Sequence, residues 1–466
     1  MSANFVNIDR DTPMFFPPDL RDWIPGNHIV HFIIDAVETL DLKNFSVNKR
    51  GSGSAQYPPE MMLTLLIYCY ATGRFSSREI EQATFFDVAV RYICGGDKHP
   101  DHDTINNFRA KNRRAFQESF VKVLMLAGEI GNLKKVGGVS VDGTKIKANA
   151  SKNAAVSYKR ASEMIKRLEI EIEELTKKAE NADSKPLEDG LTVPEEINRR
   201  KTRKEALKIA KKVIEDRYQE ELNEKQKEYE EKKNKRDKQR KNGGKPRGRE
   251  PKPPSETPPD KMQYNFTDEE SRIMKAGNAK NFMQAYNAQA VVDIEGSYLI
   301  LSKYVTAHVN DKLELIPCVE SVDSRIRGIT DILGDTGYYS QKAVKSVENN
   351  GKGPTVFCAI KKTGHHRTVE DLEKKSEPVV PPEGSSIKEI MEYRLRTKEG
   401  RERYKLRKET VEPVFGIIKH VMKFKQFLLR GEEKVGLEWD LITLAYNLKR
   451  LHKINKGVKL SILAPI

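Results

Sequence analysis

VGGVSVDGTKIKANA, residues 136–150, is the first stretch of this 466-residue chain in which the sequence predicts a strand. β-branched and small residues alternate here with no helical period, which favours a strand that ends near Asp142. Gly143 follows and permits a sharp departure of the backbone from the strand. Helical periodicity precedes this stretch, and strands and helices alternate from residue 262 onward. We therefore predict a compact α/β unit behind an all-α N-terminal domain.

Residues 1–130 have helical patterns that are compatible with a DNA-binding domain. Asp103 can cap a helix over residues 104–128, whose early exposed face carries Arg109 and Arg113. Two helices followed by this basic third one resemble a helix-turn-helix, although a basic helix face without a partner fits equally well. Aromatic residues at helical spacing are predicted to lie in the core rather than to stack on bases: Tyr68, Tyr70, Phe85 and Phe86.

A highly charged insertion interrupts the α/β unit after its first part, residues 136–156. Residues 157–234 predict an antiparallel helical hairpin that turns near 184–195, with a heptad-like seam of Ile165, Leu168, Ile172 and Leu175 against Leu207, Ala210 and Ile214. Residues 235–261 are basic and rich in proline, which predicts a disordered linker. The α/β unit resumes over residues 262–430, and a C-terminal helix and tail occupy residues 431–466.

The second half of the α/β unit alternates in type. We expect two strands joined by a turn around Glu295 and Gly296, and then an amphipathic helix over 311–326, a strand over 331–335, a helix over 340–349, a strand over 354–360 and helices over 397–430 and 437–454. Trp439 in the last helix is predicted to be core. Gln289 and Asn310 are further candidates for the neighbourhood of a site.

The composition limits the class of protein. Lys and Arg number 83 against 68 acids, and residues 199–252 alone hold 22 basic residues against 11 acids, so the positive surplus is concentrated in the insertion. Such a surplus favours a polyanionic partner. Four widely spaced cysteines without a C-x-x-C pair exclude a disulfide scaffold and a zinc ribbon and indicate a reducing, cytoplasmic location. The longest apolar run, residues 61–71, is too short to span a membrane.

Three acids stand out by their context. Asp142 and Asp335 each end a predicted strand close to a glycine, where α/β sheets place their ligands, and Glu412 lies in a late basic segment. Three such carboxylates can hold divalent cations, preferably Mg²⁺, for phosphoryl transfer. Each acid alone has a simpler explanation as a turn or surface residue. Pro413 places Glu412 at a helix start or a kink.

Glu412 and Lys419 are seven residues apart, so both face the same way if the helix between them is continuous. Gly416 lies between them on that face and would leave room for a DNA backbone.

Several stretches together resemble bacterial insertion-sequence transposases of the DDE type. They are YPPEMMLTLLIYCYATGRFSSREIE, DHDTINNFR, VSVDGTKIKANAS, SRIMK, YNAQAVVD, ILGDTGYYS, RYKLRKETVEPVFGIIKH and FLLRGEEKVGLEWDLITLAYNLKRL. The resemblance implies an RNase H-like catalytic core, a mixed sheet flanked by helices, interrupted here by the charged helical insertion. It also implies that Asp142, Asp335 and Glu412 are the catalytic metal ligands, with Mg²⁺ as cofactor and Mn²⁺ as a possible substitute.

The resemblance extends to residues that position DNA. The late motif of the family has a Tyr and an Arg before the Glu and a Lys seven residues after it. Lys419 matches the last position, Lys408 stands where the Arg is expected with Arg407 beside it, and Tyr404 is displaced by one residue. Expected partners are the terminal inverted repeats, target DNA and a second copy of the chain in a homodimer, in a nucleoid-associated location.

Three functions are compatible with these observations. The first is a transposase that cuts DNA at the ends of its element and joins them elsewhere. The second is a catalytically inactive or domesticated DNA-binding protein derived from one. The third is a structural coiled-coil protein in which the insertion dominates assembly.

Overall fold

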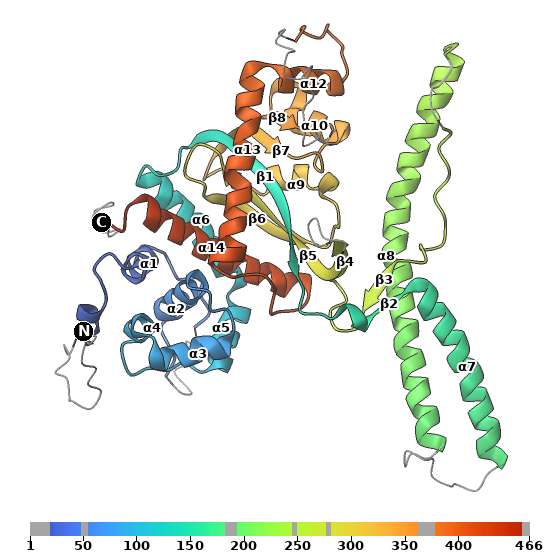
Figure 1. Ribbon diagram of the computed structural model, residues 1–466, viewed down its shortest axis with the longest axis horizontal. Helices are drawn as coiled ribbons and strands as arrows, with labels where there is room; N and C mark the ends of the chain where they lie inside the picture. The colour runs from blue at the N-terminus through green and yellow to red at the C-terminus, as the bar shows by residue number, and fades with distance from the viewer. Residues whose placement is uncertain are drawn as a thin grey trace, which may run out of the picture.

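The computed structural model describes residues 19–47, 55–181, 193–244, 249–275, 281–361 and 378–458. A mixed sheet lies at its centre, with the N-terminal helices on one side and a long helical hairpin projecting away from the sheet (Figure 1). The predicted α/β class with a helical N-terminal region is therefore confirmed. No helix among the described residues is long and apolar enough to cross a membrane.

The N-terminal region is a set of short helices: η1 (Leu20–Trp23), α1 (Ile29–Glu38), α2 (Pro59–Ala71), α3 (Ser77–Phe86), α4 (Val88–Ile93), α5 (His102–Lys111) and α6 (Arg113–Glu129). The single helix predicted over 104–128 is wrong, because the chain breaks at Asn112. The Asn112 side chain donates to the Phe108 carbonyl and accepts from the Ser46 backbone N–H, at 2.8 and 2.7 Å. Asp101, and not Asp103, caps α5 through the Thr104 N–H at 2.6 Å.

The sheet is built around β1 (Val136–Lys147). On one side β1 pairs parallel with β7 (Gly328–Gly334), which pairs parallel with β8 (Thr355–Cys358). On the other side it pairs antiparallel with β5 (Phe282–Asp293), whose far edge pairs with β4 (Arg272–Lys275) and β6 (Ile300–Thr306). The predicted turn between β5 and β6 around Glu295 and Gly296 is confirmed.

The prediction that the first strand ends near Asp142 is wrong. β1 continues to Lys147, because β5 supplies an unbroken antiparallel ladder from the pair Val139–Asp293 to the pair Lys147–Ala285. Asp142 therefore lies in the middle of the strand, opposite Ala290. Gly143 stays in the strand as well and does not form a turn. Its lack of a side chain instead leaves space for neighbouring groups.

The helices of the second half are shorter than predicted in two places. The helix expected over 311–326 is a 3-10 turn, η3 (Asp311–Leu313), followed by α9 (Leu315–Glu320), and Asp323 then accepts from the Arg325 N–H in a turn. The helical stretch expected over 397–430 ends with a π-turn, η5 (Ile417–Val421). The remaining elements are α10 (Gln341–Glu348), η4 (Asn349–Gly351), α12 (Ile387–Arg396), α13 (Lys398–Gly416) and α14 (Glu432–Ile454).

One hydrophobic core joins the N-terminal helices to the sheet. α14 lies between them and packs against α2, α6 and β6 (Figure 1). The Asn447 side chain pins α14 to β6 by accepting from the N–H of Ile300 and donating to its carbonyl, at 2.9 and 2.8 Å. Trp439 is fully buried, as predicted, and donates to the Gln289 carbonyl at 3.0 Å. Because apolar residues of all these elements form a single cluster, the N-terminal region shares its core with the sheet.

The insertion begins with η2 (Lys152–Ala154) and a small ladder of β2 (Ala155–Ser157) with β3 (Gln263–Asn265). From this base rise α7 (Tyr158–Asn181) and α8 (Val193–Lys241). The predicted seam is present in Leu168, Leu207 and Ala210, which share one buried cluster with Ile165 packed against it, and Ile214 of α8 is buried as well. Most of the predicted turn near 184–195 lies outside the described residues.

The segment predicted as a linker, residues 235–261, differs from that prediction where the structure describes it. α8 continues to Lys241, and the returning chain lies along the helix. Tyr218 donates its hydroxyl to the Ser255 carbonyl at 2.7 Å, and Arg236 donates to the Arg249 carbonyl at 3.1 Å. These side-chain donors of α8 therefore hold a proline-rich chain that cannot form a helix of its own.

Candidate active site

Asp142 and Asp335 lie at the same level on neighbouring parallel strands. The register pairs Ser140 of β1 with Leu333 of β7, and each aspartate is two residues beyond its member of that pair. β7 ends at Gly334 while β1 continues, so Asp335 stands at the end of its strand beside the middle of β1. The fold thus brings together two acids that are far apart in the sequence.

The surroundings of Asp142 disfavour its ionised form. Burial is the main cause that raises the pKa of Asp142 to about 7, and the charges of Asp335 and Asp311 add to it. Arg407 and a hydrogen bond from the Gly143 N–H at 2.9 Å act in the opposite direction. Such crowding of carboxylates, only partly offset by a cation, is typical of a site that receives a further positive charge.

Glu412 lies on α13 and is turned towards Arg407. The Arg407 guanidinium is 3.1 Å from its Oε1, and the Glu412 side chain is half exposed while that of Arg407 is largely buried. The sequence predicts that Pro413 places Glu412 at a helix start or at a kink. Glu412 is not at a helix start, because α13 runs from Lys398 through Pro413 to Gly416. Arg407 therefore acts on the carboxylates of both Glu412 and Asp142.

A further acid, Asp311, joins this neighbourhood, and the sequence did not reveal it. Its Oδ1 accepts from the amides of Asn287 and Gln289 at 2.6 and 2.8 Å, and Lys145 Nζ is 3.5 Å away. The fully buried Gln289 in turn accepts from the Tyr338 hydroxyl, just after the Asp335 loop. Asn287 and Gln289 are polar residues two positions apart on a buried strand, so their side chains face the same way. This pattern was the sequence signal for a polar site beside the strand. Gln289 therefore belongs to the site neighbourhood, whereas Asn310 is exposed beside it.

Two glycines make room for these acids. A Cβ on Gly143 would lie 2.6 Å from Asp311 Oδ1 and 2.3 Å from Gln289 Nε2. A Cβ on Gly337 would lie 2.8 Å from Asp335 Oδ1, an oxygen that accepts from the Gly337 N–H at 2.7 Å. We call Asp142, Asp311 and Asp335 with these surroundings the acidic cluster.

The predicted DNA-positioning residues of α13 and η5 occupy different environments. Lys419 is half-buried and donates to Thr144 Oγ1 at 2.5 Å and to the Lys145 carbonyl at 3.2 Å, so it fastens η5 to β1 beside Asp142. Burial lowers the pKa of Lys419, while Asp142 raises it. Lys408 is exposed, and Tyr404 packs against the apolar cluster of Ile294, Leu333 and Phe357.

The expectation that Arg109 lies on an exposed helix face is wrong. Its side chain is buried and donates to the Tyr70 hydroxyl at 2.9 Å, to the Phe75 carbonyl at 3.1 Å and to Asn106. The reason is that α5 directs this side chain towards Tyr70 of α2 and the Phe75 carbonyl in the loop after α2. Arg113 is partly exposed and pairs with Glu433 of α14 at 3.0 Å.

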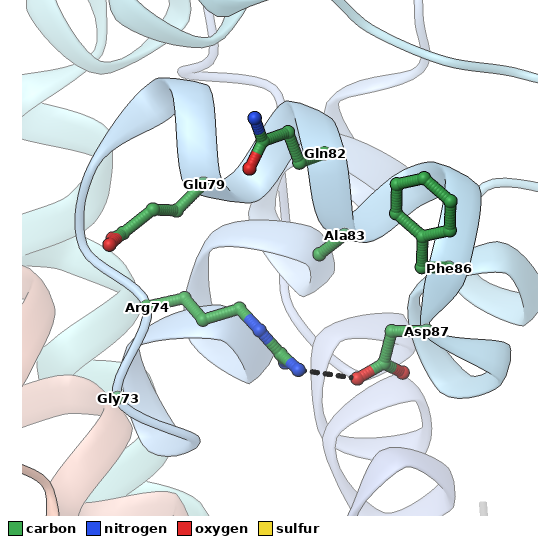
Figure 2. A pocket seen from close by; sticks show the side chains of 7 residues that line it. All are labelled: Gly73, Arg74, Glu79, Gln82, Ala83, Phe86 and Asp87. Carbon is green, nitrogen blue, oxygen red and sulfur yellow. Dashed lines mark ion pairs between the residues drawn. The ribbon is translucent and has the colours of Figure 1, made fainter.

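The surface of α3 contains a hollow of about 390 Å³ (Figure 2). Its lining includes Gln82, Glu79 and the ion pair of Arg74 with Asp87 at 2.9 Å. Phe86 at its rim is 84% exposed and Phe85 is 47% exposed, so the prediction that both are core is wrong, whereas Tyr68 and Tyr70 are buried as predicted. This hollow is separate from the acidic cluster and offers an apolar and hydrogen-bonding surface on the N-terminal helices.

The donor set of the acidic cluster fits a hard divalent cation. Asp142 and Asp335 offer carboxylate oxygens, glycines leave space beside them, and the crowding that raises the Asp142 pKa is relieved by a positive ion. Among the described residues no three acids, cysteines or histidines are already arranged to hold a metal ion, and Glu412 is engaged by Arg407. Asp142 and Asp335 thus lie close together, whereas the Glu412 carboxylate faces Arg407.

Two family models match the chain. Residues 18–111 match a transposase domain (DUF772), and residues 361–452 match a transposase DDE domain. The second match includes Glu412, Arg407, Lys408, Tyr404 and Lys419, and neither includes Asp142 or Asp335. No curated protein and no solved structure matches the chain.

The matches agree with the architecture. A DDE transposase domain implies an RNase H-like core, and the mixed sheet of antiparallel β6, β5 and β1 with parallel β7 and β8 is that core. One matched segment precedes the strands of the sheet in the sequence, and the other follows them. The two matches together support an insertion-sequence DDE transposase.

Proposed function

We propose that this transposase cuts DNA at the ends of its insertion sequence and joins the freed ends to a target, and that Asp142, Asp335 and Glu412 are its catalytic acids. The observation that carries the proposal is the placement of Asp142 beside Asp335 at the end of β7, with the Asp142 pKa raised to about 7. The family match over Glu412 supports the third member.

The acids would hold Mg²⁺, with Mn²⁺ as a possible substitute. A bound divalent ion lowers the pKa of a water or hydroxyl nucleophile and stabilises the leaving oxygen of a phosphodiester. Asp142 would hold the ion from the middle of β1, and Asp335 from the loop held by the Gly337 N–H. Glu412 would be the third ligand once released from Arg407, and the Arg407 guanidinium would then be able to pair with a phosphate.

The remaining basic residues would position DNA. Lys408 is exposed one position from Arg407 and can contact the backbone as a point charge. Lys419 orients the strand that carries Asp142 through Thr144. Gly416 has no atom within 4 Å of its Cβ position, which leaves space on this helix face for a phosphodiester chain.

Two ends must be brought together for strand transfer, so we propose a homodimer as the active assembly. Its DNA partners would be the terminal inverted repeats and the target. The exposed surface of α3 around Phe86 and Gln82 is our candidate for repeat recognition in place of Arg109.

The test uses the full chain and duplexes that carry the inverted repeats flanking its gene. With Mg²⁺ the wild-type protein should nick the duplex at the element end, and Asp142→Asn and Asp335→Asn should each lower the rate by at least a thousandfold. Asp216→Asn on exposed α8 is the matched control and should cleave normally. Equal cleavage by wild type and Asp335→Asn would refute the assignment, and salt-sensitive binding without cleavage by the wild type would support the inactive alternative.

A further inference from the structure

α8 is far longer than α7, its partner in the helical hairpin. It has 49 residues, about 73 Å at about 1.5 Å per residue, whereas α7 has 24. The residues of α8 buried against its surroundings end at Leu222, and the helix continues to Lys241 with the returning chain along one side (Figure 1). Packing of an apolar face is what usually stabilises a helix in a protein, and the end of α8 has little of it. This helix end is therefore a candidate for binding a partner.

The net charge of α8 after Leu222 changes sign along the helix. Residues 224–231 contain four acids and two lysines, whereas residues 232–241, which we call the α8 arm, contain seven Lys or Arg and one acid. The returning residues 249–256 are balanced, with two basic residues and two acids, so they do not neutralise the arm. The positive charge is therefore confined to the tip.

Three lysines of the arm are spaced by three residues and are exposed: Lys235, Lys238 and Lys241. No ion pair joins any of the three to an acid in the part of the chain that the structure describes. Two other basic residues of the arm are engaged, Lys232 with Glu228 at 2.8 Å and Arg240 with Glu250 at 2.5 Å. The three lysines are thus a row of cations available to an external anion.

The part of α8 just before the arm lies near α10 and near Lys312, the residue after Asp311. Glu231 is 3.9 Å from Lys342 of α10. A hydrogen bond from Lys232 is the main cause that lowers the pKa of Glu228, and the charges of Lys312 and Lys342 add to it. Lys312 directly follows Asp311. The arm therefore starts at the edge of the candidate active site.

We propose that the α8 arm binds the phosphate backbone of duplex DNA that leaves the active site, through Lys235, Lys238 and Lys241. From Glu228 to Lys241 the helix rises about 20 Å at about 1.5 Å per residue, which equals about six base pairs at about 3.4 Å each. The contact is independent of sequence, because lysines on an exposed helix face read charge alone. The inference rests on the proposed function for the position of the DNA, and its binding test does not.

The first experiment measures binding without metal, so that no cleavage is needed. The full chain and a variant with Lys235→Gln, Lys238→Gln and Lys241→Gln are titrated with a fluorescent duplex of random sequence, about 40 base pairs long, over a range of salt concentrations. The variant should bind at least tenfold more weakly at about 100 mM salt, and the slope of log K against log salt should be shallower by about 2 to 3, since each lost phosphate contact removes about 0.9.

The control variant carries the same number of changes on the proximal half of the same helix: Lys201→Gln, Lys208→Gln and Lys212→Gln, all exposed positions. It should keep the wild-type slope. An unchanged slope in the arm variant, or an equal loss in the control, would overturn the proposal. An arm variant that binds DNA like the wild type but sediments as a smaller species would also overturn it, because the arm would then be a surface for a second copy of the chain.

The second experiment places the arm on the DNA. Duplexes with the element end are shortened stepwise on one side of the cleavage site. Wild-type affinity should fall when the flank becomes shorter than about six base pairs, and the arm variant should not respond. Failure of cleavage with an intact salt-slope difference would count against the proposed function alone.

Discussion

Asp142 is partly buried in the middle of β1, and the charge of Asp335 at the end of β7 adds to the desolvation that raises the Asp142 pKa. The antiparallel ladder with β5 fixes Asp142, and the hydrogen bond from the Gly337 N–H holds Asp335 in the loop after β7, so the two acids cannot easily move apart. The repulsion is thus built into the sheet, and a cation is the natural means of relieving it.

Metal affinity should depend on pH around the Asp142 pKa of about 7. Below this pH a bound cation must displace a proton from Asp142, so affinity should rise up to about tenfold per pH unit and level off above it. Titration with Mn²⁺ at a series of pH values on both sides of neutrality, followed by electron paramagnetic resonance, measures this. A pH-independent affinity would contradict the role of Asp142, and Asp142→Asn should bind weakly at every pH.

The stability of the metal-free protein should depend on pH in the opposite sense. The folded pKa of Asp142, about 7, lies above its ordinary value of 3.8, so the folded state retains a proton that the unfolded state loses. The contribution of Asp142 to stability is then present below about pH 4 and lost as the pH rises to about 7. Asp142→Asn should therefore melt at a higher temperature than the wild type at about pH 8, with a smaller difference at about pH 5. Differential scanning calorimetry in EDTA checks this, and a less stable variant at the higher pH would contradict it.

Gly143→Ala should abolish cleavage and lower stability. The new methyl group would lie 2.3 Å from Gln289 Nε2 and 2.6 Å from Asp311 Oδ1, groups that hold each other by hydrogen bonds. Relief requires breaking that contact, which costs about 1–3 kcal/mol. Urea unfolding measures the cost. Gly416→Ala is the control, because its Cβ position is open, and it should gain up to about 1 kcal/mol from helix propensity.

Asp311→Asn should act on Asp142. The substitution keeps an oxygen that can accept from Asn287 and Gln289 but removes a negative charge that raises the Asp142 pKa. The midpoint of the pH dependence of Mn²⁺ binding should therefore move to lower pH, which a purely structural role would not cause. Lys145→Gln removes the cation beside Asp311 and serves as the comparison. A midpoint that stays in place would exclude this positioning role.

Arg109→Ala should destabilise the protein without weakening DNA binding per folded molecule. The buried guanidinium satisfies Tyr70 and the Phe75 carbonyl, and its charge opposes the burial that raises the pKa of Glu438 to about 7. Its removal should cost about 3–5 kcal/mol, because it leaves a buried acid without a cation. Urea unfolding and anisotropy of the folded fraction separate the two effects. Exposed Lys111→Ala on the same helix should leave stability unchanged.

Local patterns were sufficient for several features. The buried α2, the β5–β6 hairpin and the seam of the insertion follow from apolar periodicity and turn residues, because each depends on neighbours in the sequence. The helix break at Asn112 does not follow from such a pattern, because the Asn112 side chain is fixed by Ser46, a residue distant in the sequence. The prediction for Phe85 and Phe86 is wrong for a similar reason: helical spacing identifies an apolar residue but not which face is covered.

Motifs in the chain pointed to Asp142, Asp335 and Glu412 and to a transposase, and the family matches support the transposase over two parts of the chain. The sequence could not indicate that β1 runs past Asp142 or that Asp311 approaches through the space left by Gly143. Nor could it indicate that Arg407 would act on both Glu412 and Asp142. Each of these relationships includes residues more than about a hundred positions apart. Only strand pairing and helix packing bring such residues together, and no local pattern contains that information.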